Sequence, residues 1–189
     1  MENNNTTQTH VTQKLFTEML RPQTLDQAII VPRIREVLQH GLTTNILLSG
    51  SAGAGKTSLT RILTRGYQVL EINASLENGI DTIRDKVIAF ASQSSLFDGE
   101  EKLKVVVLEE CDGLSPEAWK ALRATIEKYH KTVRFIANCN YIDKVPDPIQ
   151  SRFNVIIIDP LTKEEEEYLF KGYLERIKYI LTKFNIQYT

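Results

Sequence analysis

A chain of 189 residues in which 42% of the side chains are hydrophobic and 25% are charged has enough apolar material for the core of one globular unit. Its longest apolar runs are much shorter than the roughly 18 residues that cross a membrane, and its polar first ten residues lack a signal-peptide pattern, so we expect an intracellular protein with no membrane partner. A net charge of −1 argues against nucleic-acid binding through bulk positive charge, although a local basic stripe is compatible with it.

Short apolar runs alternate with amphipathic segments after residues 1–14, a polar stretch that we expect to be a flexible tail. The residues expected in strands are 45–49, 68–72, 104–108, 133–138 and 154–159, and those expected in helices are 32–40, 56–65, 80–91 and a segment opened by Ser115 and Pro116. Each parallel crossover requires a helix, and each inner strand is then buried on both faces. The pattern therefore predicts an α/β, doubly wound fold around a parallel sheet.

The last segment differs from the alternating part of the chain. Thr162 and Glu165 fit a T-x-x-E capping box, and an acidic first turn suits the positive end of the helix dipole. The predicted helix has a broad apolar face made of Leu169, Phe170, Tyr173, Leu174, Ile177, Ile180, Leu181 and Phe184. That face requires a larger partner surface than one sheet edge offers, so we expect the chain to be a truncated piece of a longer protein.

Two cysteines, Cys111 and Cys139, follow predicted strands. They lack the paired spacing of metal ligands, and the chain carries no secretory signal pattern. We therefore expect reduced structural thiols rather than a disulfide or a zinc site.

The stretch GSAGAGKT satisfies G-x-x-x-x-G-K-[ST] and lies between a predicted strand and a predicted helix. Glycines let several backbone N–H groups point at phosphate oxygens, Lys56 reaches the β and γ phosphates, and Thr57 offers its hydroxyl to Mg²⁺. The sequence thus predicts a nucleoside triphosphate site whose binding residues are Gly50, Ser51, Ala52, Gly53, Ala54, Gly55, Lys56, Thr57 and Ser58.

Two adjacent acids end the apolar run VVVLEE. Parallel strands place their carboxyl ends at one edge of the sheet, so these acids are expected near the phosphate loop. We assign Glu109 to Mg²⁺ binding and Glu110 to activation of water as general base. The alternative is an acidic exit from a strand into a loop, with no chemical role.

The set GSAGAGKT, VVVLEECDGLS, FIANCN and PIQSRF resembles the AAA+ ATPase module of sliding-clamp loader small subunits, as in replication factor C and its bacteriophage counterparts. LRPQTLD and LEINASLENGIDTIRDKV are similar to further family stretches, and FASQSSLFDG is similar to the phage form. The resemblance spans about residues 15–187 and implies a P-loop, AAA+ type five-stranded parallel sheet. It also implies that the strand before Asn140 lies between the phosphate-loop strand and the Glu109 strand. Residues 15–160 would be the ATPase domain, and residues 161–189 would be the start of a helical lid domain.

The same resemblance suggests roles for single residues. Arg21 would lie beside the nucleotide, Asn140 would be the sensor that positions water and the γ phosphate, and Arg152 would be an arginine finger acting on a neighbouring subunit. Without the matching motif, Arg152 would be read as a solvated surface arginine, and the motif favours the finger. Arg84 and Lys86 would contact DNA phosphates, although a solvated helix face of mixed charge is about as compatible with their acidic neighbours.

Two positions depart from the family pattern. The family usually has Asp where Glu109 stands, and we expect the extra methylene to displace the metal ligand and slow hydrolysis. It usually has Cys where Phe153 stands, which we expect to be a matter of packing.

The resemblance implies an ATP- and Mg²⁺-dependent hydrolase subunit, in a hetero-oligomeric ring, that loads a sliding clamp on primer-template DNA. Its location would be cytoplasmic, in the host cytoplasm if phage-encoded, or nuclear if eukaryotic. Two alternatives remain: a nucleotide-bound scaffold subunit of the same complex that does not hydrolyse ATP, and another AAA+ DNA motor such as a branch-migration helicase.

Overall fold

Five parallel strands form one sheet in the computed structural model, which describes residue 18 and residues 20–93 and 103–185. The strand order is β2-β3-β4-β1-β5. The strands are β1 (Ile46–Ser49), β2 (Gln68–Asn73), β3 (Lys104–Glu109), β4 (Val133–Cys139) and β5 (Asn154–Ile157). The predicted parallel sheet is confirmed. So is the expected place of β4, the strand before Asn140, between the phosphate-loop strand β1 and the Glu109 strand β3.

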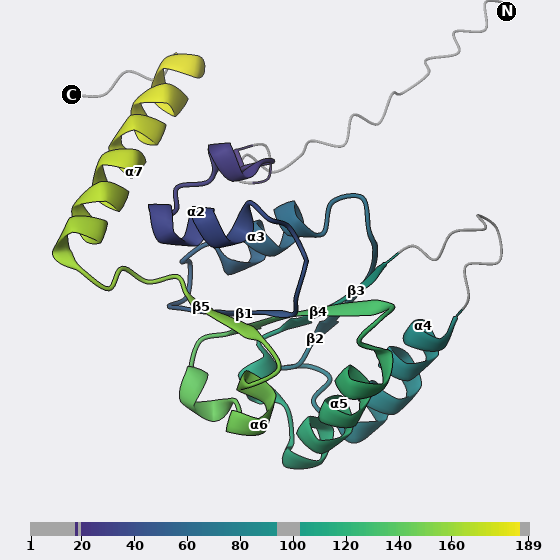
Figure 1. The fold of residues 1–189 in the computed structure, drawn as a ribbon. Coiled ribbons are helices and arrows are strands. Elements are labelled where there is room, and N and C mark those ends of the chain that lie inside the picture. The colour runs from purple at the N-terminus through teal and green to yellow at the C-terminus, as the bar shows by residue number, and fades with distance from the viewer. Residues whose placement is uncertain (1–17, 19, 94–102, 186–189) are drawn as a thin grey trace, which may run out of the picture.

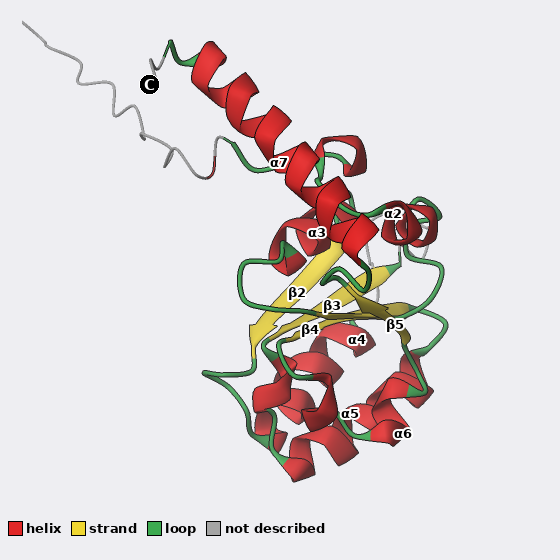
Figure 2. Cartoon of the chain, turned by 90° about the vertical axis from the view of Figure 1, so that its left-hand side faces the viewer, coloured by secondary structure: helices red, strands yellow, loops and turns green. Residues whose placement is uncertain are grey.

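Helices cover both faces of the sheet, giving three layers (Figure 1). One face carries α2 (Pro32–Leu38) and α3 (Lys56–Leu63), and the other carries η2 (Thr82–Ile88), α4 (Ala89–Ser92), α5 (Pro116–Tyr129) and α6 (Asp147–Gln150). Short 3₁₀ turns, η1 (Leu25–Gln27), η3 (Cys111–Gly113) and η4 (Ile142–Lys144), complete the layers. The final helix is α7 (Lys163–Lys183), which projects away from the sheet (Figure 2).

The central strands carry continuous apolar runs because each face of the sheet is buried. In β3, Val105 and Val107 pack into the core on the α2 and α3 side, while Val106 and Leu108 pack into the core on the α5 side. All four side chains are buried. This double burial explains why the sequence shows continuous apolar runs instead of an alternating pattern.

The predicted helix at 80–91 forms with a change of winding. Its first part, η2, is a π-helix, and only the second part, α4, is α-helical. Ile83 and Val87 remain buried on the core face, so the apolar spacing still fixes which side packs inward. An apolar pattern alone does not reveal the wider π turn, which is common at functional sites.

The predicted capping of α7 is half confirmed. Thr162 Oγ1 accepts a hydrogen bond from the backbone N–H of Glu165 at 3.2 Å. The Glu165 carboxylate does not return a bond to Thr162. It accepts instead from the Leu161 N–H at 2.8 Å and from Arg33. The cap therefore also ties α7 to α2.

The apolar side of α7 is largely uncovered, as the sequence predicted. Phe170, Tyr173, Leu174 and Ile177 are each at least 41% exposed. Within residues 20–93 and 103–185, no helix combines the length and apolar content needed to cross a membrane. The tail expected at residues 1–14 and part of the phage-like stretch lie outside the described residues.

Candidate nucleotide-binding site

The phosphate loop connects β1 to α3, which confirms the predicted strand, loop and helix. Gly53 and Gly55 have φ values of +82° and +97°, a region that residues with a side chain rarely adopt. The loop ends at Gly55, and α3 starts at Lys56. The first N–H groups of α3 lack intrahelical partners, so this end of the helix is a favourable place for a phosphate.

Lys56 connects the loop to the neighbouring strand end. Its ammonium donates to the Gly50 carbonyl at 2.6 Å, the Ser51 carbonyl at 2.9 Å and Asn140 Oδ1 at 2.8 Å. Asn140 follows β4, which pairs with β1, so the strand order brings the two side chains together. The proposed sensor therefore lies within hydrogen-bond distance of the lysine that is expected to bind phosphate.

Glu109, the last residue of β3, lies beside Thr57 in the first turn of α3. Thr57 Oγ1 donates to Glu109 Oε2 at 3.2 Å, while Glu109 Oε1 is buried without a hydrogen-bond partner among the described residues. A buried carboxylate oxygen without a partner is costly unless a cation or donor satisfies it. Mg²⁺ typically takes one or two protein oxygens and completes its shell with phosphates and water. The donor set therefore fits the predicted Mg²⁺.

Glu110 follows β3 in a left-handed conformation, with φ of +53°. For a residue with a Cβ this costs about 1–2 kcal/mol. Glu110 lines a pocket of about 200 Å³ together with Lys56, Thr57, Glu109 and Asn140. The structure thus brings the predicted base, metal ligands, lysine and sensor to one pocket.

Of two further predicted residues, Ser58 and Arg21, only the first lies beside this pocket. Ser58 lines an adjoining pocket with Gly53 and Gly55. Arg21 is not placed with them, because it lines a separate pocket with Arg61 and Arg65 and forms an ion pair with Glu18 at 2.8 Å. The expected position of Arg21 beside the nucleotide stays a prediction.

Sequence reasoning missed Asp159, which fixes the loop from outside. Its carboxylate accepts from the Ser51 N–H and from Ser51 Oγ, each at 2.8 Å. Asp159 also lines a pocket of about 380 Å³ with the loop residues Ala52 and Gly53 and with Phe170 of α7. Its place at the end of the last predicted strand, at the same sheet edge as the loop, was the available signal.

Arg33 of α2 holds the connection between β5 and α7. Its guanidinium donates to the carbonyls of Ile157 at 2.7 Å and Asp159 at 3.0 Å, and it binds Glu165 with an Nε–Oε1 distance of 2.7 Å. The hydrogen bond from Arg33, followed by that from the Leu161 N–H, lowers the pKa of Glu165. The base of α7 is thereby fixed against the core that carries the phosphate loop.

This ion pair makes the attachment of α7 dependent on pH. Because folding lowers the pKa of Glu165, its contribution to stability is present above the ordinary Glu pKa of 4.5 and is lost as the pH falls through the lowered value. We expect Glu165→Gln to lower the midpoint of thermal unfolding at pH 7 and to have little effect on it at pH 3. Thermal unfolding of both proteins between pH 3 and pH 7 checks this, with Glu175→Gln on the same helix as control. An equal difference at both ends would contradict it.

Cys111 and Cys139 are free and buried, one residue from Glu110 and Asn140 respectively, and Cys139 helps to line the pocket. The hydrogen bond between the two thiols, then burial, raises the pKa of Cys111. The same hydrogen bond lowers the pKa of Cys139. Both side chains belong to the core, which matches the structural role expected from the sequence.

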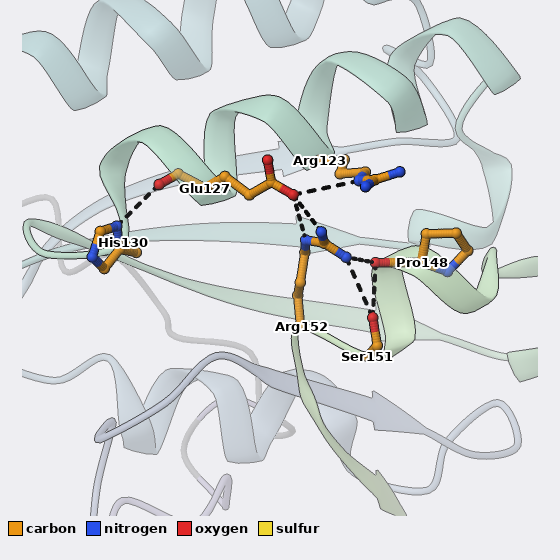
Figure 3. Close-up of polar contacts among 6 residues, drawn as sticks. All are labelled: Arg123, Glu127, His130, Pro148, Ser151 and Arg152. Carbon is orange, nitrogen blue, oxygen red and sulfur yellow. Dashed lines mark hydrogen bonds and ion pairs between the residues drawn. The ribbon is translucent and has the colours of Figure 1, made fainter.

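Arg152 lies at the opposite end of the sheet. Its carbonyl accepts from Asn45 Nδ2 at 3.1 Å. Asn45 precedes β1, whereas the phosphate loop follows it, and the four residues of β1 span roughly 13 Å. Figure 3 shows the guanidinium turned toward Glu127 of α5 and the end of α6. Arg152 is therefore not part of the pocket around Lys56 in its own chain.

The residue after Arg152 confirms a packing prediction. Phe153, which stands where the resembled family usually has Cys, is only 9% exposed. It packs in the core on the α5 side of the sheet.

Arg84 and Lys86 lie on η2, away from the residues that line the phosphate-loop pocket. Arg84 is exposed, and Lys86 forms an ion pair with Glu77. This ion pair reduces the positive charge that Lys86 could offer to a DNA phosphate. A contact of either residue with DNA stays a prediction.

A loop with the P-loop pattern, two acids and Asn140 at the carboxyl edge of a parallel sheet define a P-loop nucleoside-triphosphate fold. The family described as the ATPase family associated with various cellular activities (AAA) matches residues 46–161. The chain belongs to this family, which implies nucleotide binding.

Similar proteins refine the resemblance seen in the motifs. The chain is 38% identical over 163 residues to the Replication factor C small subunit of Haloarcula marismortui, covering 80% of this chain and 49% of that protein. It is 37% identical over 186 residues to the Replication factor C small subunit of Sulfurisphaera tokodaii, covering 92% of this chain and 54% of that protein. The chain thus spans about half the length of these relatives. The inferred resemblance to the clamp-loader small-subunit module is confirmed.

Solved structures support the fold alone. The RuvB Holliday junction branch migration motor of Thermotoga maritima superposes with a TM-score of 0.62 at 20% identity, over 84% of this chain and 55% of that one. A DNA polymerase III gamma subunit-related protein of the same organism gives 0.54 at 21%, over 77% and 56%. The predicted α/β, AAA+ type fold is confirmed.

Proposed function

We propose that the protein is an ATPase subunit of a sliding-clamp loader, which couples ATP binding and hydrolysis to loading of the clamp on primer-template DNA. The observation that carries the ATPase proposal is the convergence of Lys56, Thr57, Glu109 and Glu110 on one pocket. Similarity to Replication factor C small subunits supports the replication role. In this proposal residues 15–160 are the ATPase domain, and residues 161–189 begin a lid.

Each pocket residue has a task that follows from its position. Lys56 donates to β and γ phosphate oxygens, and the N–H groups of the loop bind the same phosphates. Mg²⁺, when bound by Thr57 and Glu109, neutralises charge on the phosphates. Asn140 orients the attacking water, and the Glu110 carboxylate accepts its proton as the γ phosphate leaves ADP.

In this proposal Arg152 acts on another subunit, because it lies far from the nucleotide pocket of its own chain. Since it lies at the other end of the sheet, it is suited to a phosphate held by a neighbouring subunit and not to its own. A guanidinium there would stabilise charge that develops on the neighbour's γ phosphate. The proposed partners are accordingly other loader subunits, the clamp and DNA. The proposed location is the cytoplasm, or the nucleus in a eukaryote.

A second candidate is a nucleotide-bound scaffold subunit that does not hydrolyse ATP. Glu109, one methylene longer than the family's usual Asp, favours it, because a displaced metal ligand would slow hydrolysis. Turnover by the assembled complex that rises with clamp and DNA supports the ATPase subunit. Helicase activity on forked DNA without a clamp would instead support another AAA+ DNA motor.

Lys56→Ala tests whether this pocket is the nucleotide site. Losing a charged donor to phosphate typically costs 1.5–3 kcal/mol, so we expect ATP affinity to fall by about 100-fold. Titration with a fluorescent ATP analogue measures the change. Lys131→Ala, which removes an exposed lysine after α5, is the control and should bind like the wild type. Unchanged affinity of Lys56→Ala would place the nucleotide elsewhere.

A further inference from the structure

The side chain of Arg152 is held by Glu127, a residue that does not line the nucleotide pocket. Glu127 Oε1 accepts from Arg152 Nε at 3.0 Å and also from Nη2. On the other side, Nη1 donates to the Pro148 carbonyl and lies 3.3 Å from Ser151 Oγ. Figure 3 shows the guanidinium between α5 and the end of α6, in contact with both.

The two elements that carry this pair are packed into the core. On α5, Leu122 and Ile126 are buried in the core, which fixes the helix face that presents Glu127. Around Arg152, Ile149 and Phe153 are buried on either side along the chain. The backbone at both residues is therefore set by packing, and the ion pair fixes the side chain that packing leaves free.

Electrostatics agree with a lasting pair. The hydrogen bond from Arg152, its charge, and a weaker contact with Arg123 at 3.4 Å together lower the pKa of Glu127. Glu127 is thus ionised at neutral pH. Arg152 retains a side-chain exposure of 25%, so its guanidinium is anchored without being closed off from an incoming phosphate.

We infer that Glu127 is a positioning residue that orients Arg152 toward a phosphate bound by a neighbouring subunit. The inference rests on the proposed role of Arg152. An unrestrained arginine has many rotamers, and a guanidinium that is oriented in advance loses less conformational freedom when it meets its target. Glu127 takes the Nε and Nη2 side, and Pro148 and Ser151 accept from Nη1. An incoming phosphate would bind the second N–H of Nη2 and displace the Nη1 contacts.

The test compares variants within the assembled complex that contains this chain. We expect Glu127→Ala to lower kcat for ATP by about tenfold with little change in KM, because the ground-state nucleotide site is untouched. Glu127→Gln keeps the shape and one acceptor, so its loss should be smaller. Glu117→Ala on the same helix is the control and should match the wild type. Thermal unfolding shows whether each variant is folded.

The double variant separates positioning from a merely structural effect. If Glu127 acts through Arg152, then adding Glu127→Ala to Arg152→Ala causes no further loss. A further loss, a wild-type kcat for Glu127→Ala, or a raised kcat would overturn the inference, the last by showing that Glu127 restrains Arg152. If Arg152→Ala itself keeps full turnover, the proposed finger role fails and the inference fails with it. If Arg152→Ala loses turnover and Glu127→Ala does not, the finger role of Arg152 is supported and only the positioning role of Glu127 is overturned.

Discussion

Glu110→Gln is expected to lower kcat for ATP hydrolysis by about 10³-fold while ATP affinity stays unchanged. Glutamine keeps the shape of the side chain but does not take up the proton of the attacking water. Glu110 lines the same pocket as Lys56 and Thr57. ATP affinity should not change, because Lys56 and Thr57 make the expected contacts to phosphate and metal. Steady-state turnover and nucleotide titration of the assembled complex give the two quantities separately.

The control for Glu110→Gln is Glu36→Gln, an exposed position on α2. It should leave both turnover and affinity as in the wild type. Wild-type turnover by Glu110→Gln would remove the assigned base. A wild-type complex that binds ATP without any turnover would support the scaffold reading instead.

Arg152→Ala is also expected to lower kcat by about 10³-fold, the effect typical of a lost arginine finger. The physical reason is the position of Arg152, which lies at the end of β1 opposite to the phosphate loop. Its loss should therefore impair the site of a neighbour and leave nucleotide binding by its own chain intact. Turnover and nucleotide titration of the variant complex measure both.

Mixing two defective variants tests action between subunits. Arg152→Ala keeps an intact pocket, and Lys56→Ala keeps an intact Arg152. A mixed assembly should regain part of the turnover that each variant lacks alone. No recovery on mixing, with both variants assembled, would mean that Arg152 does not act on a neighbour's site.

The parts of the site that local patterns encode could be predicted from the sequence. The loop that ends in Lys56 and Thr57 has a fixed spacing, and Glu109 and Glu110 end an apolar run that only a buried strand explains. Since strand ends of a parallel sheet share an edge, their meeting followed from fold class. Asn140 required the family resemblance, because an asparagine after a strand is common in turns.

Individual contacts between distant residues outside the recognised motifs could not be predicted. Ser51 and Asp159 are 108 residues apart, and Arg33 and Glu165 are 132 apart, so no spacing in the sequence connects them. Glu165 was instead assigned to a local capping box, and the tertiary contact with Arg33 prevailed over it. The π winding of η2 was missed for a related reason, since Ile83 and Val87 pack inward in either helical form.

The central claim is that Lys56, Thr57, Glu109 and Glu110 act on one Mg²⁺-bound triphosphate. A crystal structure with Mg²⁺ and a non-hydrolysable ATP analogue tests it most directly. We expect Mg²⁺ at Thr57 Oγ1 and Glu109, Lys56 against the β and γ phosphates, and a water between Glu110 and the γ phosphate. A triphosphate bound elsewhere, or one bound here with both acids remote from the metal and the γ phosphate, would contradict the account.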